Sequence, residues 1–94
     1  MTLSPITDEL RAQYTISDDV KGVIVTAVAE GSNAAEKRIV AGDVIVEVAQ
    51  ESVSAPADVA ARVKALKDED RRLALFLMSN AQGEVRFIPL SIEE

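Results

Sequence analysis

Three pairs of neighbouring carboxylates are the residues of this chain best suited to acid–base chemistry: Asp8-Glu9, Asp18-Asp19 and Glu93-Glu94. A catalytic carboxylate needs a desolvated site that shifts its pKa, and these pairs lie in polar stretches typical of surfaces and helix starts. The 94 residues include no histidine and no cysteine. Their absence excludes a Ser-His-Asp triad, thiol chemistry and disulfides within the chain, and it argues against a structural zinc site. We therefore expect no catalytic residue, no metal and no cofactor.

Net charge and hydropathy argue against nucleic acid as a partner and against a segment that spans a membrane. The net charge is −6, whereas nucleic-acid binding needs a basic patch. The longest apolar run, Leu73 to Met78, is far too short to span a bilayer. The N-terminus has no basic segment followed by an apolar one, so we expect no signal peptide here. Nearly half the residues are hydrophobic, which predicts one globular domain over residues 1–94 with a core of Val, Ile, Leu and Ala.

The fold class follows from the order of predicted elements. We expect a mainly β domain: a partly open antiparallel barrel or sandwich of five to six strands, capped by two or three helices. Runs of β-branched and apolar residues predict the strands, and runs of helix formers after capping residues predict the helices. The strands are Met1–Ser4, Val23–Ala29, Val44–Val48, Ser52-Val53, Leu73–Met78 and Glu84–Ile92, and the helices are Asp8–Tyr14, Ala34–Lys37 and Pro56–Lys67.

The helix from Pro56 carries its own start signals. Ser54 is expected to cap it, Pro56 lies in its first turn, and Asp58 is near the positive end of its dipole. Val59, Val63 and Leu66 share one face at spacings of four and three, so this face is predicted to pack on the sheet.

The block from Ala34 to Val48 combines a short helix, a glycine turn and a buried strand. Ser32 or Asn33 can cap the helix, Gly42 can take a positive φ, and Asp43 can accept hydrogen bonds from turn amides. A turn glycine with an aspartate beside it is what a strand start needs, so we interpret Gly42-Asp43 as structural rather than as a ligand contact.

This order of elements resembles a PDZ domain of the HtrA/Deg (Do-like) serine proteases of bacteria. The resemblance rests on the motifs Gly-Val-Ile-Val, Glu-Gly-Ser-Asn-Ala-Ala, Ala-Gly-Asp-Val-Ile and Val-Ser-Ala-Pro-Ala-Asp-Val, which begin at Gly22, Glu30, Ala41 and Val53. It extends to the closing hairpin and so covers nearly the whole chain.

The resemblance implies a peptide-binding module that regulates a periplasmic serine protease active in protein quality control. Its partners would be extended peptides or unfolded protein C-termini, other domains of the parent protease, and its oligomer. An edge strand would take the peptide as an added strand. By this resemblance the strand residues are Met1, Thr2, Leu3 and Ser4, and the facing helix contributes Pro56, Ala60, Val63 and Lys64.

Two departures from the family pattern shape this expectation. The loop that holds the ligand carboxylate would precede residue 1, with Met1 at its last apolar position, so we expect it to be truncated. The small Pro56 and Ala60 replace larger polar residues on the helix, which predicts a shallow, apolar groove of modest selectivity.

Alternatives stay open at the level of residues and of role. Met1 and Leu3 can equally be core residues, and Lys64 can be a solvated helix residue. The domain can also be a structural or oligomerisation module that binds no peptide. A third possibility is a PDZ domain of another bacterial processing protease or secretion component.

Overall fold

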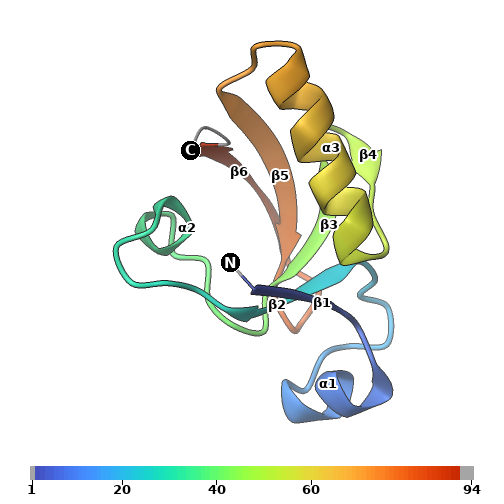
Figure 1. The fold of residues 1–94 in the computed structure, drawn as a ribbon. Helices are drawn as coiled ribbons and strands as arrows, with labels where there is room; N and C mark the ends of the chain where they lie inside the picture. The colour runs from blue at the N-terminus through green and yellow to red at the C-terminus, as the bar shows by residue number, and fades with distance from the viewer. Residues whose placement is uncertain (1, 92–94) are drawn as a thin grey trace.

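The computed structural model describes residues 2–91, and residues 1 and 92–94 lie outside the described part. The described residues form nine elements, and Figure 1 shows their arrangement. Each predicted helix and strand is present, with ends that differ by at most two residues where they are described. The elements are β1 (Thr2–Pro5), α1 (Asp8–Gln13), β2 (Val23–Ala27), α2 (Asn33–Glu36), β3 (Val44–Val48), β4 (Glu51–Ser52), α3 (Pro56–Asp68), β5 (Leu73–Ser79) and β6 (Val85–Ser91).

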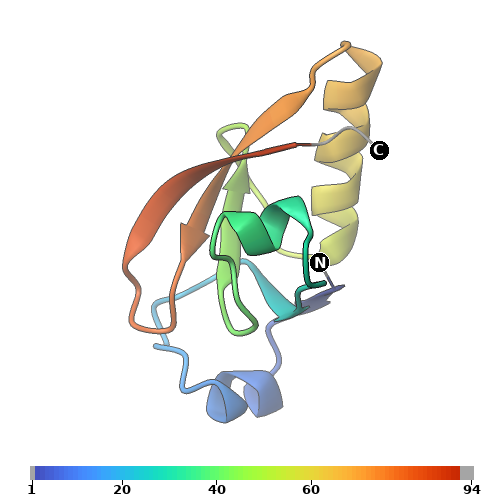
Figure 2. The same cartoon turned by 90° about the vertical axis from the view of Figure 1, so that its left-hand side faces the viewer.

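The strands form one antiparallel sheet in the order β1-β2-β3-β5-β6, and β4 pairs with the end of β3. Figures 1 and 2 show α3 along one side of the curved sheet, α2 near the end of β6, and α1 at the far end of the molecule. This open antiparallel sheet with three short helices confirms the predicted fold class. No helix within residues 2–91 is long and apolar enough to cross a membrane.

Apolar side chains cover both faces of β2. Val23 and Val25 belong to a large buried cluster with α3, whereas Ile24 points to a second, smaller cluster beside α1. This alternation explains why the strand carries consecutive apolar residues. The large cluster also holds Phe76 and Met78, so the core is not built from small aliphatic residues alone. The smaller cluster contains Ile16, Val20, Ile24 and Val44, with Ile6, Leu10, Tyr14, Val46 and Ala81 packed against it.

The start of α3 differs from the prediction in one detail. Ala55, not Ser54, occupies the cap position, and a methyl group cannot accept a hydrogen bond. The carboxylate of Asp58 does the capping from inside the helix: its Oδ2 accepts from the N–H groups of Ser54 (3.0 Å) and Ala55 (3.1 Å) and from Ser54 Oγ (3.1 Å). The predicted serine cap was therefore wrong, because Ser54 donates its hydroxyl to Asp58 instead.

Thr7 and Ser32 cap the other two helices, and Ser32 is one of the two caps that the sequence allows for α2. Thr7 Oγ1 accepts from the Leu10 N–H at 3.1 Å, and Ser32 Oγ accepts from the Ala35 N–H at 3.2 Å. Each hydroxyl satisfies one of the helix's orphan backbone donors.

Candidate functional site

The exposed edge of β1 offers backbone groups to an added strand. Val25, on β2, lies opposite Leu3. The Val25 N–H donates to the Asp43 carbonyl at 2.8 Å, and the Val25 carbonyl accepts from the Gly42 N–H at 2.7 Å. Val25 therefore turns both groups toward the β3 side, so the Leu3–Val25 pair exchanges no hydrogen bond. In an antiparallel ladder, the N–H and C=O of Leu3 then point away from β2, to the free edge.

The other residues of β1 contribute less to this edge. The Thr2 carbonyl accepts from Thr26 Oγ1 at 3.3 Å, on the β2 side. Pro5 has no N–H, and its carbonyl accepts from Ser4 Oγ at 3.0 Å. Within Thr2–Pro5, Leu3 is thus the residue that presents a donor and an acceptor together, and Pro5 ends the segment that can pair. Met1, the first residue of the predicted site, lies outside the described part of the chain.

The opposite edge of the sheet, on β6, is blocked along its second half. The Ser91 N–H points away from β5 and donates to Asn33 Oδ1 at 2.8 Å. Because backbone direction alternates along a strand, every second residue before Ser91 also points its backbone groups away from β5. Pro89 holds the next outward position and has no N–H to offer. Two successive outward positions therefore lack a free donor, and a strand cannot pair along this half of β6.

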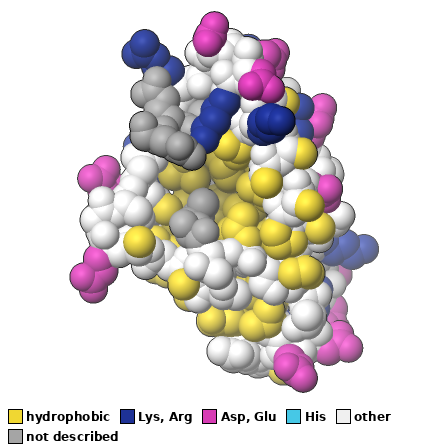
Figure 3. Space-filling view, viewed as in Figure 1, with side chains coloured by type: hydrophobic (Ala, Val, Ile, Leu, Met, Phe, Trp, Pro, Cys, Tyr) yellow, Lys and Arg dark blue, Asp and Glu magenta, His cyan; other side chains and the backbone are white. Residues whose placement is uncertain are grey.

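Helix α3 contacts β1 and forms the second wall of the predicted site. Leu3 and Val63 are both half-buried and pack on the same large cluster, whereas Ala60 and Lys64 are exposed. Figure 3 shows apolar side chains gathered on this face of the molecule, with charged side chains around its margin. We call the set Thr2, Leu3, Ser4, Pro56, Ala60, Val63 and Lys64 the β1–α3 surface.

Lys64 is the charged member of this surface. No hydrogen bond or ion pair joins its side chain to another residue in the described range 2–91. Its ammonium group is thus available to an acidic side chain of a ligand, as well as to water.

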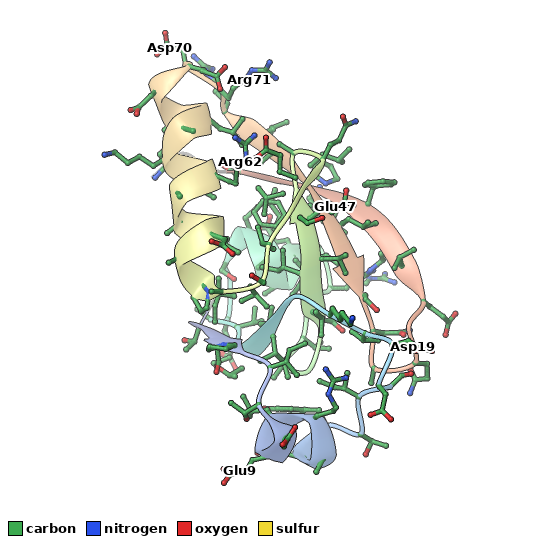
Figure 4. The ribbon with its side chains drawn as sticks, turned by 90° about the vertical axis from the view of Figure 1, so that its right-hand side faces the viewer. Glu9, Asp19, Glu47, Arg62, Asp70 and Arg71 are labelled. Atoms are coloured by element: carbon green, nitrogen blue, oxygen red, sulfur yellow. The ribbon has the colours of Figure 1, made fainter. Side chains whose placement is uncertain are left out.

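Two further contacts fix the position of α3. Arg62 extends from α3 toward the β3–β4 hairpin (Figure 4), where its Nε lies 3.2 Å from Glu51 Oε2. At the helix start, hydrogen bonds from Ser54 and then from Ala55 hold the pKa of Asp58 below its ordinary value. Neither residue was among the predicted site residues, because their role is to hold the helix rather than to touch a ligand.

The Gly42-Asp43 turn has the structural role expected of it. Gly42 adopts a φ of +100°, and a Cβ there would lie 3.0 Å from Tyr14 Cδ1. Asp43 Oδ2 accepts from the Val40 N–H at 3.2 Å. The turn also supplies the two backbone partners of Val25, so it sets the orientation of β2 and, through it, the free groups of Leu3.

Two cavities of about 410 Å³ lie away from β1. One is bordered by Arg38, Asp43, Asn80 and Arg86, and the other lies between α3, Ala49-Gln50 and the start of β5. Neither borders the free groups of Leu3, and residues 2–91 hold no cluster of His, Cys, Asp and Glu suited to a metal ion. Of the acidic pairs, Asp8-Glu9 lies in the first turn of α1, Asp18-Asp19 is exposed, and Glu93-Glu94 is outside the described part.

Comparison with known proteins identifies the family of the chain. The PDZ domain model matches residues 7–78, which is most of the chain, and the chain belongs to the PDZ domain family. The matched range includes α3 but leaves out β1, so the free edge rests on the structure itself.

The chain is also similar to curated bacterial proteins named "Probable periplasmic serine endoprotease DegP-like". It is 39% identical to the one from Brucella suis over 79 residues and 38% identical to the one from Bartonella henselae over 76 residues. The relative from Rickettsia conorii is 27% identical over 92 residues. These alignments cover 83%, 81% and 98% of this chain but 15–17% of each relative. The predicted resemblance to the Do-like protease PDZ domains is therefore confirmed.

Proposed function

We propose that this domain is the peptide-binding module of a DegP-like periplasmic serine endoprotease and that it holds an extended peptide as an added strand along β1. The outward N–H and C=O of Leu3 carry the proposal, because a peptide residue opposite Leu3 satisfies both groups at once. The bound segment regulates the parent protease, which acts in the periplasm. The domain itself contributes no catalytic group.

The neighbouring side chains indicate the kind of peptide. Val63 and Leu3 present an apolar floor, and Ala60 leaves room above it. A peptide with alternating apolar residues places every second side chain against this floor. Few polar groups converge on the surface, which favours broad selectivity and suits segments of unfolded proteins.

The test is a titration of the ¹⁵N-labelled domain with the pentapeptide N-acetyl-Ser-Val-Tyr-Val-Val up to about 1 mM, the range of weak peptide capture. We expect amide shift changes in Thr2–Ser4 and along the Leu3-facing side of α3. Ala60→Phe should weaken binding by roughly tenfold or more, because the ring fills the space that the peptide needs. Ala61→Phe is the matched control, since Ala61 is also exposed on α3 but lies about 100° further round the helix than Ala60.

The same peptide with an amidated C-terminus tests whether the domain recognises the C-terminal carboxylate of its ligand. We expect the acid and the amide to bind within about threefold of each other, less than 1 kcal/mol apart, because recognition runs through the β1 edge. Shift changes confined to other elements, or equal losses in Ala60→Phe and Ala61→Phe, would contradict strand addition at β1.

A structural or oligomerisation role is a second candidate, and the exposed apolar side chains of Leu75, Val85 and Phe87 on β5 and β6 favour it. The relatives described above carry the protease name, which favours this origin over another processing protease or a secretion component.

A further inference from the structure

The β5–β6 hairpin has one uncovered apolar face, on the side opposite the large core cluster. Ala74, Phe76, Met78, Ile88 and Leu90 point into the core, and their neighbours in sequence point outward. Four of the outward side chains are large and exposed: Leu73 (59%), Leu75 (40%), Val85 (59%) and Phe87 (60%). The hairpin face is the set Leu73, Leu75, Leu77, Val85, Phe87 and Pro89.

Strand register makes these residues one continuous patch. Leu77 lies directly across from Phe87, and Leu75 lies across from Pro89. Such cross-strand neighbours have Cβ atoms about 5 Å apart, so their side chains touch. Outside the hairpin, the described residues include one other large exposed hydrophobic side chain, Val40 at 59%.

No charged residue belongs to the hairpin face itself, although Arg62, Glu69 and Arg71 border the same cavity as Leu73 and Leu75. Neither strand has an acidic residue, and the single basic one, Arg86, belongs to the alternate set of positions. Its guanidinium donates to the Arg38 carbonyl at 3.2 Å and lies 4.0 Å from Asp43. Glu47 on β3, paired with Leu77 and labelled in Figure 4, marks the border of the patch.

We propose that the hairpin face is a self-association surface on which a second copy of the domain packs face to face about a two-fold axis. Each copy carries a net charge of −6, so two copies repel one another wherever charged surfaces meet. A neutral, apolar patch is the surface on which that repulsion is smallest and the gain from burial largest. A two-fold axis lets the same patch serve both partners.

The size of the patch sets the strength of the association. Two strands of seven residues cover a plane of roughly 23 by 10 Å. Side-chain relief about doubles that area, so the two copies together bury about 1,000 Å², the low end for specific interfaces. The isolated domain should therefore dimerise weakly, with Kd on the order of 0.1–1 mM, and Phe87 is the central aromatic anchor.

The partly blocked edge of β6 favours contact through the faces. Because Pro89 and the Asn33–Ser91 hydrogen bond remove free donors from that edge, the hairpins cannot join edge to edge through its second half. Contact through the faces leaves both β1 edges exposed, so self-association is independent of peptide binding at the β1–α3 surface.

The experiment records ¹⁵N–¹H spectra and sedimentation equilibrium of the domain from about 20 µM to 2 mM, a range that brackets the expected Kd. We expect concentration-dependent shifts in β5 and β6. Association should be several-fold stronger in 500 mM than in 50 mM NaCl, because salt screens the repulsion between the two negative copies.

Phe87→Ser and Leu75→Ser should each weaken association by roughly tenfold or more while leaving pentapeptide binding unchanged. Val40→Ser is the matched control: it removes a side chain of similar exposure that is outside the hairpin face, although it borders the same cavity as Val85, and it should leave association unchanged. Conversely, Ala60→Phe should leave association unchanged, which separates this inference from the proposed function. A domain that stays monomeric at 2 mM in both salts, or that loses association equally in Val40→Ser and Phe87→Ser, would overturn the proposal.

Discussion

At the scale of single residues, the least expected contributor is Asp58. Its carboxylate replaces a missing cap and accepts three hydrogen bonds at the start of α3. The helix that walls the predicted peptide site is thus held at its first turn by a charged group on the surface.

Asp58 should make stability depend on pH in the acid range. Its pKa is lowered in the folded state, while in the unfolded chain a carboxyl titrates near its ordinary value of about 3.9. The contribution of Asp58 to the free energy of unfolding is therefore complete above that value, and it is lost as the pH falls through the lower pKa of the folded state. Asp58→Ala should lower the Tm at pH 7, and the difference from wild type should shrink as the pH falls below about 4.

The control for this change lies at the other end of the same helix. Asp68→Ala removes an acid from the negative end of the helix dipole, so it should leave the Tm unchanged or raise it. Thermal unfolding followed by circular dichroism at pH 7 and at acid pH measures both. Equal losses in the two variants would contradict the capping role.

At the scale of elements, the close approach of β2 and β3 depends on Gly22, the residue before β2. Gly22 has a φ of +143°, and a Cβ there would lie 2.1 Å from the Ile45 carbonyl oxygen, on β3. That contact is far inside van der Waals distance and involves backbone, so the strands must separate to admit a side chain.

Gly22→Ala should therefore cost at least about 3 kcal/mol of unfolding free energy, since backbone strain of about 1–3 kcal/mol adds to the clash. Gly31→Ala is the matched comparison, because Gly31 has a φ of +74° and a Cβ added there would have nothing within 4 Å. It should cost only about 1–2 kcal/mol, the penalty of the left-handed conformation. Urea titrations give both values, and similar losses would show that the Ile45 contact is not the cause.

At the scale of the whole molecule, the two apolar clusters are unequal. The large cluster joins α3 to β2, β3, β5 and β6, whereas the smaller one lies beside α1, which has no buried residue of its own. The α1 end is tied down partly by Arg11, whose Nη2 donates to the Val20 carbonyl at 3.1 Å.

We expect α1 to open without the rest of the domain. Its amides should exchange with solvent through a local opening of lower free energy, while those of β3 and β5 exchange only on global unfolding. Native-state hydrogen exchange in increasing denaturant measures this difference. Identical opening free energies across α1, β3 and β5 would show that the molecule is a single cooperative unit.

The sequence was enough to predict what local patterns determine. The helix starts at Thr7 and Ser32, the glycine turn and the succession of elements along the chain all depend on residues close together in the chain. The sequence alone does not determine which face of β6 points outward. Phe87 and Ile88 are both apolar, and only the pairing of β6 with β5 decides which of them is buried. The free backbone groups of Leu3 likewise depend on Val25, Gly42 and Asp43, which are distant in sequence.

The blocked half of β6 has a consequence for how copies of this domain could misassemble. Growth of a fibre by strand addition needs two open sheet edges on every molecule, one to accept a neighbour and one to offer to the next. In the described chain, β1 offers such an edge, while Pro89 and Asn33 stop pairing along the second half of β6. A neighbouring strand can therefore pair along β1 but, on β6, only along the first half, so growth by strand addition has a shorter edge to use on that side.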